Sequence, residues 1–366
     1  MHILLLEPYF TGSHRSWSEE FQFYSQHEIQ ILSMKGQFWK WRMHGGAVSL
    51  ANQFNDSDVQ PDLILATSML DLTTFLSLTR HRSSEIPVAI YLHENQLSYP
   101  WSAKDRDLVE KRNKHYGFIN YASALAADHV LFNSKYHKSS FIQEAKNLLI
   151  HFPDYNELKS IDKIEEKSKV LYLGLDLNRF NSYKTNHDGL PLILWNHRWE
   201  YDKNPEDFFN TLFRLNDEGF EFQLAILGKN FKTTPSIFDD SKQKLSDKIV
   251  HFGFCESFES YAQWLWKADI LPVTNIQDFF GISIMEALYC DVYPILPNRL
   301  TYPELLPEAY HQNHIYNDEA ELYDKLKSAI IDISTVRKCK FSSVAEKFDW
   351  NRMAPIYDEL FSSIKV

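Results

Sequence analysis

The stretch ILPVTNIQDFFGISIMEALY, residues 270–289, contains an apolar run, a polar turn with one glycine and a segment of helical spacing. A short apolar run that leads directly into a helix is typical of the strand–helix unit of a parallel sheet. Further apolar runs of strand length lie, with helical segments between them, at residues 192–195, 223–227, 249–252 and 292–296. This half of the chain is therefore predicted to form a parallel sheet covered by helices on both faces.

The same pattern occurs in the first half of the chain. Its apolar runs, again separated by helical segments, lie at residues 3–6, 28–32, 62–66, 88–92 and 129–132. Because 366 residues exceed the size at which a single core usually stops growing, the two sets predict two Rossmann-like, doubly wound α/β domains. We expect an N-terminal domain at 1–175, a C-terminal domain at 176–348, and a C-terminal helix at 349–366 that packs back across the hinge.

Composition and charge narrow the class of protein. The net charge of −11 argues against broad nonspecific binding to nucleic acid, although it allows a local basic patch. Three distant cysteines without a CxxC pair favour a reducing cytoplasm. No apolar run approaches the ~20 residues that a membrane span needs, and the first strand leaves no room for a signal peptide. We expect a soluble, cytoplasmic protein.

Two polar clusters follow strands of the second half, at the sheet edge where ligands bind. In the first, Gly281 opens a helix whose amides can face an anion, and Glu286 is placed to accept hydrogen bonds from a ribose. Asp278 before the turn either contacts a sugar or only caps the helix. In the second, Arg198 and Lys203 either hold a diphosphate or form surface salt bridges with neighbouring acids.

Two further clusters follow strands of the first half. Gly12 and Ser13 in EPYFTGSHR, residues 7–15, suit close approach to a phosphate or sugar, although an ordinary strand-to-helix turn is favoured. The pair Gly45–Gly46 has the same two interpretations. Four consecutive polar residues from His93 to Gln96 follow a buried strand and suit hydrogen bonding to sugar hydroxyls. No GxGxxG motif follows the first predicted strand of either half of the chain, which disfavours hydride transfer with a dinucleotide.

Together these clusters resemble retaining GT-B glycosyltransferases with a Glu-x7-Glu signature, which reads Asp278-x7-Glu286 here. A narrower resemblance is to the tRNA-queuosine mannosyltransferase family. It rests on EPYFTGSH (7–14), YLHENQLSYP (91–100), WNHRWEYDKNP (195–205), DFFGISIMEALYC (278–290) and YPELLP (302–307). The resemblance implies the GT-B fold, with two Rossmann-like domains facing each other across a cleft.

The resemblance also implies an activity: retaining transfer of mannose from GDP-mannose onto the queuosine cyclopentene-diol of a tRNA, without a metal or other cofactor. Site roles are implied in the same way, for the diphosphate (Arg198, Lys203), the ribose (Glu286), the transferred sugar (Asp278 with the backbone of Gly281, Ile282 and Ser283), the anomeric carbon (His93) and the phosphates or acceptor (Gly12, Ser13, His14, Glu94, Asn95, Gln96). The departure is Asp278, one methylene shorter than the glutamate of the general signature.

The acceptor is the least constrained part of this prediction. Basic stretches at residues 40–42, 80–82 and 111–115 all lie in the first domain. Phe38, Trp39 and Trp41 could stack on unpaired bases, whereas solvated helix faces are the alternative for the basic stretches. Two rival functions therefore stay open: a glycosyltransferase with a small-molecule or lipid acceptor, and a protein that binds a nucleotide sugar without transferring it.

Overall fold

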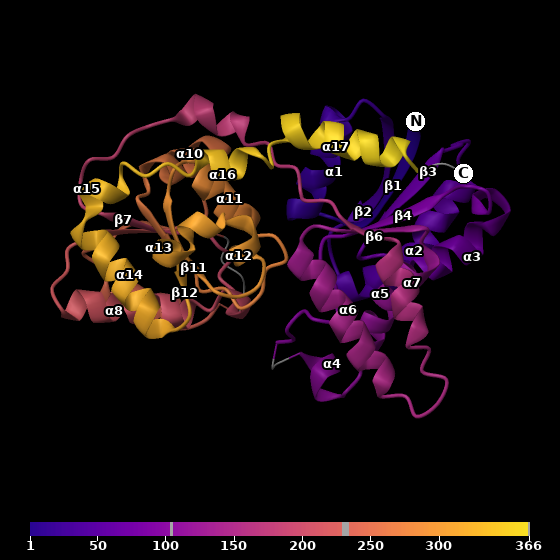
Figure 1. Cartoon of the computed structure of the whole chain (residues 1–366), viewed down its shortest axis with the longest axis horizontal. Helices are drawn as coiled ribbons and strands as arrows, with labels where there is room; N and C mark the ends of the chain where they lie inside the picture. Colours follow the sequence, from indigo (N-terminus) through magenta and orange to yellow (C-terminus); the bar gives the residue numbers. More distant parts are fainter. Residues whose placement is uncertain (103–104, 229–233, 365–366) are drawn as a thin grey trace. The chain divides into compact units, whose positions relative to one another are not determined.

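The computed structural model describes residues 1–102, 105–228 and 234–364. The chain divides into two compact units, one formed by Met1–Leu175 with Trp350–Val366 and the other by Asp176–Asp349. Each unit contains a six-stranded sheet whose described strand pairs are all parallel (Figure 1). The predicted α/β class is confirmed. None of the described helices is long and apolar enough to cross a membrane.

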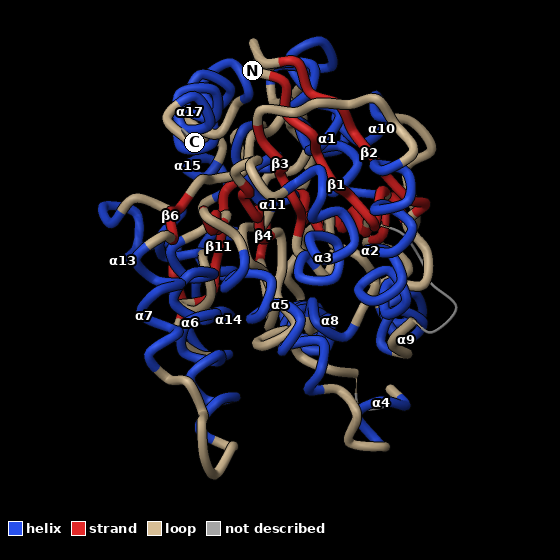
Figure 2. The backbone as a smooth tube through the Cα atoms, turned by 90° about the vertical axis from the view of Figure 1, so that its right-hand side faces the viewer, coloured by secondary structure: helices blue, strands red, loops and turns tan. Residues whose placement is uncertain are grey.

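The first unit has the strand order β2-β1-β3-β4-β5-β6. Figure 2 shows β1, β2 and β3 running side by side. The strands are β1 (His2–Phe10), β2 (Glu28–Lys35), β3 (Leu63–Thr67), β4 (Val88–Leu92), β5 (His129–Phe132) and β6 (Ser168–Val170). The helices are α1 (Gly12–Tyr24), α2 (Trp39–Asn55), α3 (Leu72–Ser83), α4 (Arg106–Val109), α5 (Lys114–Ala126), α6 (Lys135–Ile150), α7 (Lys159–Glu166) and α17 (Trp350–Ser362). β3 and β4 are buried along their whole length, as expected of central strands covered on both faces.

The second unit has the strand order β12-β11-β10-β7-β8-β9. Its strands are β7 (Leu192–Trp195), β8 (Gln223–Ile226), β9 (Ile249–Phe252), β10 (Ile270–Pro272), β11 (Tyr293–Pro297) and β12 (Ile315–Tyr316). Its helices are η1 (Asn178–Tyr183), η2 (Tyr201–Lys203), α8 (Pro205–Asp217), α9 (Ile237–Lys244), α10 (Phe258–Lys267), α11 (Ile282–Tyr289), α12 (Tyr302–Leu305), η3 (Glu308–Tyr310), α13 (His311–His314), α14 (Glu319–Ile331), α15 (Ile333–Val336) and α16 (Ser342–Glu346). Helix α11 directly follows β10, as the opening stretch of sequence predicts.

Two local features differ from the sequence-based expectations. The helical segment at 105–127 is divided into α4 and α5, and Lys111 between them has a left-handed φ of +56°. Gly45 and Gly46 lie inside α2 rather than in a ligand-binding turn. A Cβ on Gly46 would lie 3.1 Å from Pro8 Cβ, so this glycine lets α2 pack closely against the end of β1.

Helix α17 returns to the first unit, where Figure 1 shows it beside α1. Trp350 is fully buried, stacks on Phe21 at 6.0 Å and donates a hydrogen bond from Nε1 to Glu20 Oε2 at 2.7 Å. In the second half of the helix, the Tyr357 hydroxyl donates a hydrogen bond to the Tyr172 carbonyl at 2.9 Å. The helix therefore completes the core of this unit.

Replacing Trp350 with alanine is expected to lower the free energy of unfolding by about 3–5 kcal/mol, because the change opens a cavity and removes the donor that Glu20 holds. Urea unfolding measures the effect. The matched control is Ile356→Ala on the same helix, whose side chain is 49% exposed and should change stability by about 0.5 kcal/mol or less. Equal losses for the two variants would contradict the packing described for α17.

Candidate active site

The loops that follow β7 and β10 meet at one edge of the second sheet, because the two strands are parallel neighbours with Ile270 opposite Ile193. The Ile276 amide donates to the Asp202 carbonyl at 3.0 Å, and Thr274 Oγ1 donates to the carbonyls of Lys203 and Asn204 at 3.0 and 2.8 Å. These contacts join the two loops. They bring together residues that lie some 75 positions apart in the chain.

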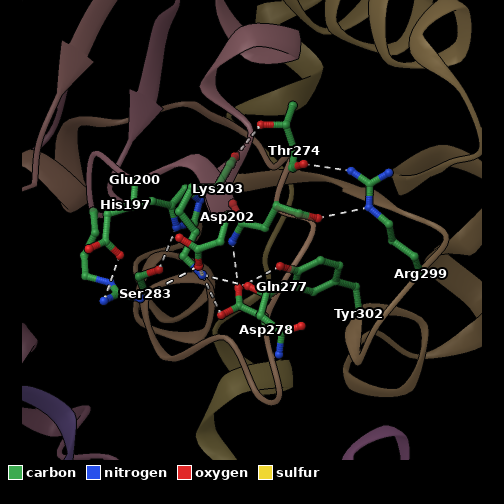
Figure 3. A network of polar contacts seen from close by, with 12 residues as sticks. His197, Glu200, Asp202, Lys203, Thr274, Gln277, Asp278, Ser283, Arg299 and Tyr302 are labelled. Carbon is green, nitrogen blue, oxygen red and sulfur yellow. Dashed lines mark hydrogen bonds and ion pairs between the residues drawn. The ribbon is translucent and has the colours of Figure 1, made fainter. Parts of the chain in front are cut away.

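Lys203 and Asp278 form the centre of this arrangement (Figure 3). Lys203 is buried, and its Nζ lies 2.7 Å from the Gln277 carbonyl, 3.1 Å from Asp278 Oδ1 and 3.2 Å from Asp202 Oδ2. Asp278 also accepts hydrogen bonds on Oδ2 from Tyr302 and Asn275, at 2.7 and 2.6 Å.

The charge state of Asp278 follows from these neighbours. Burial raises the pKa of this carboxyl, but the charge on Lys203 and the hydrogen bond from Tyr302 outweigh burial, so the pKa lies below its usual value. Asp278 is therefore an ionised acid held in one orientation. Because its oxygens bind Lys203, Tyr302 and Asn275, it does more than cap the helix that follows.

Arg198 is the accessible cation of the site. Its side chain is 51% exposed, with Nη1 at 2.9 Å from Glu200 Oε2 and Nη2 at 3.8 Å from Asp202 Oδ2. Both acids are sequence neighbours of Arg198, so they form the salt bridges that were the alternative interpretation of this cluster. Because the guanidinium is half exposed, an anionic ligand can reach it in place of Glu200.

The start of helix α11 is fixed against the loop after β7. Gly281 has a φ of +88°, which favours glycine, and its carbonyl accepts the first hydrogen bonds of the helix. Ser283 follows Ile282 in the first turn; its carbonyl accepts from Asn196 Nδ2 at 2.7 Å, and its Oγ lies 3.1 Å from His197 Nδ1. Burial lowers the pKa of His197 to about 3, so its ring is neutral. The amino end of α11 is thus a rigid set of backbone amides beside Asp278, suited to an anion.

Glu286 lies on α11 one turn after Ser283. Its Oε2 accepts a hydrogen bond from the Tyr261 hydroxyl at 2.6 Å, and its Oε1 lies 3.7 Å from Arg179 Nη2. Burial raises the pKa of Glu286, and the two partners only partly oppose this shift. Sequence reasoning assigned no ligand-binding role to Tyr261 on α10 or to Arg179 on η1, because neither residue lies in a ligand-binding motif.

In the first unit, an ion cluster forms where β1 ends and α1 begins. His14 lies between two carboxylates, with Nδ1 at 2.9 Å from Glu7 Oε2 and Nε2 at 3.2 Å from Glu94 Oε2. Burial lowers the pKa of His14, but the two carboxylates together raise it well above the ordinary value. His14 is therefore a charged imidazolium fixed by two acids, one of which, Glu7, is fully buried.

His93 packs beside this cluster, with its ring 4.5 Å from that of His14 and 4.6 Å from that of Trp17. Burial, followed by the charge on His14, lowers its pKa well below the ordinary value, so His93 is neutral. Within the described residues its Nε2 is buried without a hydrogen-bond partner. Ligand atoms of His93, His14 and Glu7 lie within 4.8 Å of one another, a spacing that could hold a metal ion. His14 has both ring nitrogens engaged by carboxylates, which suits an ion cluster better than a metal centre.

The other predicted residues of this loop group have separate positions. Gly12 and Ser13 are exposed at the first turn of α1, where Gly12 has a φ of +50° and open space around it. Asn95 is fully buried, and its Oδ1 accepts from the amides of Leu97 and Ser98. These bonds shape the loop, and within the described residues Asn95 Nδ2 is buried without a hydrogen-bond partner. The backbone N–H of Gln96 donates a hydrogen bond to Asn120 Oδ1 at 2.7 Å.

Comparison with known proteins assigns the family. Residues 2–175 match the model of the tRNA-queuosine alpha-mannosyltransferase N-terminal domain, and residues 179–340 match glycosyl transferases group 1. The chain is 32% identical to a Drosophila melanogaster tRNA-queuosine alpha-mannosyltransferase, over 99% of this chain and 96% of the relative. The chain belongs to the tRNA-queuosine alpha-mannosyltransferase family. It is therefore a glycosyltransferase.

Solved structures support the fold of this tRNA-queuosine alpha-mannosyltransferase family member. The chain matches Anabaena HepE in complex with UDP and glucose, with a TM-score of 0.66, 16% identity and 99% of each chain covered. It matches sucrose-phosphate synthase from Thermosynechococcus elongatus with a TM-score of 0.71, 12% identity and both chains fully covered. The predicted GT-B fold is confirmed.

The His14 ion cluster should make stability depend on pH. The folded-state pKa lies above the unfolded value of about 6.5, so this stabilisation is fully present below about pH 6.5 and is lost as the pH rises through the folded pKa. The unfolding free energy lost in His14→Gln should therefore be larger near pH 6 than near pH 9.5, as measured by urea unfolding of both proteins. A loss that grows with pH would contradict the charged state assigned to His14.

Proposed function

We propose that this glycosyltransferase moves mannose from GDP-mannose, with retention of configuration, onto the queuosine cyclopentene-diol of a tRNA. The observation that carries the proposal is the match over nearly the whole chain to a tRNA-queuosine alpha-mannosyltransferase. The site in the second unit supports a nucleotide-sugar donor, because it combines Lys203 and Arg198, the amino end of α11, and a buried acid one turn further on. Since the proposed acceptor is a tRNA, the cytoplasm is the compartment in which we expect the reaction.

The proposed reaction needs no covalent enzyme intermediate. The bond between C1 of mannose and the diphosphate breaks, and a bond from C1 to one oxygen of the acceptor diol forms on the same face of the sugar. The diol proton moves to an oxygen of the departing diphosphate, so the products are GDP and mannosylated queuosine. Arg198, Lys203 and the α11 amides would stabilise the charge that develops on the diphosphate. Asp278 holds Lys203 in position, and no metal is required.

Glu286 is proposed to bind the donor ribose, and Tyr261 to position it. Tyr261→Phe removes the hydrogen bond to Glu286 and keeps the ring, so the KM for the donor should rise about tenfold while kcat changes little. Steady-state kinetics with varied donor measures this. The control is Tyr183→Phe, whose ring packs on Phe258 in the same unit. A Tyr261→Phe enzyme with the wild-type donor KM would contradict the role of this pair.

Donor identity and stereochemistry have their own test. GDP-mannose, UDP-glucose and UDP-galactose are supplied in turn with queuosine tRNA, and the anomeric configuration of the transferred sugar is read from sensitivity to α-mannosidase. We expect transfer from GDP-mannose and release of the label by α-mannosidase. Preferred transfer from a UDP-sugar, or an α-mannosidase-resistant product, would refute the donor or the retaining course. Nucleotide binding with no transfer to any acceptor would favour the non-catalytic alternative.

A further inference from the structure

The exposed side of helix α2 has an unusual composition for a surface. Phe38, directly before the helix, is 75% exposed and Trp41 is 63% exposed. His44, one turn further along, is also exposed. Large aromatic side chains are mostly buried in soluble domains. Two exposed large rings and an exposed histidine, spaced three residues apart at the start of one helix, therefore suggest a surface that binds a ligand.

Trp41 is held flat rather than free. Gly45 lies one turn after Trp41, and a Cβ placed on Gly45 would overlap the Trp41 indole. The indole therefore lies against the helix backbone at this glycine and leaves its other face to solvent. Trp39 behaves differently, because it packs inward against Tyr116 and Trp101 at ring distances of 5.1 and 5.8 Å. Of the three aromatic residues that the sequence offered for base stacking, only Phe38 and Trp41 are available.

Exposed basic side chains border this surface. The His44 ring stacks on that of exposed His115 in α5, at 5.0 Å and 25° between planes. His115 follows Lys114, and Lys111 lies just before; both lysines are exposed. Lys40 is not counted, because it is already paired with Asp105 and Asp107.

The acidic excess of the protein also lies elsewhere. The first unit has 20 Lys and Arg against 22 Asp and Glu, a net of −2, whereas the second has 18 against 27, a net of −9. The negative charge of the whole chain therefore does not oppose RNA binding at this surface as strongly as the total of −11 implies.

We propose that Phe38, Trp41, His44 and His115 form a stacking face for unpaired bases of an RNA, with Lys111 and Lys114 contacting its phosphates. Flat rings next to cations are what single-stranded RNA requires, because bases stack on the rings and the backbone is neutralised beside them. The inference rests on the proposed function, since it identifies the surface that would bind the tRNA acceptor.

The experiment measures RNA binding and transfer separately. Filter binding of a labelled anticodon stem-loop, with no sugar donor present, should show a Kd about tenfold higher for Trp41→Ala than for wild type. Transfer kinetics should show a higher KM for tRNA and an unchanged KM for the donor. The matched control is Phe23→Ala, an aromatic residue on α1 that is 80% exposed and should bind RNA like wild type.

Gly45→Ala gives a second, independent variant. Alanine favours the helix more than glycine does, but its methyl group would displace the indole, so RNA binding should fall while the melting temperature does not. Wild-type RNA affinity in both Trp41→Ala and Gly45→Ala would overturn the inference, even if the wild-type enzyme transfers mannose to tRNA. RNA affinity that depends on Trp41 in an enzyme without transfer would keep the inference and refute the proposed function.

Discussion

Replacing Lys203 with alanine is expected to lower the turnover of sugar transfer at least about a hundredfold, the effect typical of removing one group that stabilises charge in the transition state. Lys203 Nζ is buried and fixed by the Gln277 carbonyl and by Asp278. Its charge is therefore positioned before the donor arrives, and few other groups could replace it. Single-turnover transfer at saturating donor and acceptor measures the loss.

The Lys203 variant needs a control for stability, because its removal leaves Asp202 and Asp278 buried with less compensation. Lys248 is the matched residue: it is also buried in the second unit, where its Nζ lies 3.3 Å from Glu221 Oε2 and its ring contact is Phe222. Lys248→Ala should lower the melting temperature and leave turnover per folded molecule nearly unchanged. Comparable turnover in both variants would refute the role of Lys203.

Asp278→Ala should cause a loss of similar size, about a hundredfold in turnover, because it removes the acid that fixes Lys203 and accepts from Tyr302 and Asn275. Asp278→Glu is the more informative change. It restores the general glutamate signature, but the longer side chain must fit where three contacts of 2.6–3.1 Å already surround the carboxylate. We expect activity to fall, because an extra methylene in a closely packed site displaces the side chains around it.

Asp269→Asn is the control for the Asp278 variants. Asp269 is a buried acid of the same unit, held by two contacts to Arg337 at 2.7 and 2.9 Å. Its loss should weaken folding without a selective effect on turnover. An Asp278→Glu enzyme more active than wild type would show instead that the surrounding residues do not set the length of this acid.

The sequence predicted much of the fold because central parallel strands are buried on both faces and so appear as short apolar runs. Residues 192–195 and 88–92 were predicted with the bounds of β7 and β4. β12 was not predicted, because its two residues are too few to form a recognisable apolar run. β6 was not predicted either, because it lies in a charged stretch and is only partly buried. The sequence analysis gave no bounds for helix α2, because Gly45 and Gly46 favour a turn locally and only their packing against Pro8 and Trp41 explains them.

The candidate site was less accessible to sequence reasoning. The loops of Asp278 and Lys203 could be paired in advance, because carboxyl ends of parallel strands share one edge. The direct ion pair between these two residues could not be predicted, because it depends on side-chain orientation. Tyr261 has no motif around it and is brought to Glu286 only by tertiary packing. Sequence reasoning treated His14 as one of several residues in its loop. In the structure it is the centre of a cluster, because it lies between Glu7 and Glu94, which are eighty-seven positions apart in the chain.

The most direct test of the central claim is a transfer assay with purified protein, GDP-mannose labelled in the sugar, and tRNA with or without queuosine. We predict that label enters queuosine tRNA alone, and that Lys203→Ala abolishes most of this transfer while Lys248→Ala does not. Equal labelling of both tRNAs, or transfer only to a small glycoside, lipid or free nucleoside, would contradict the proposed function.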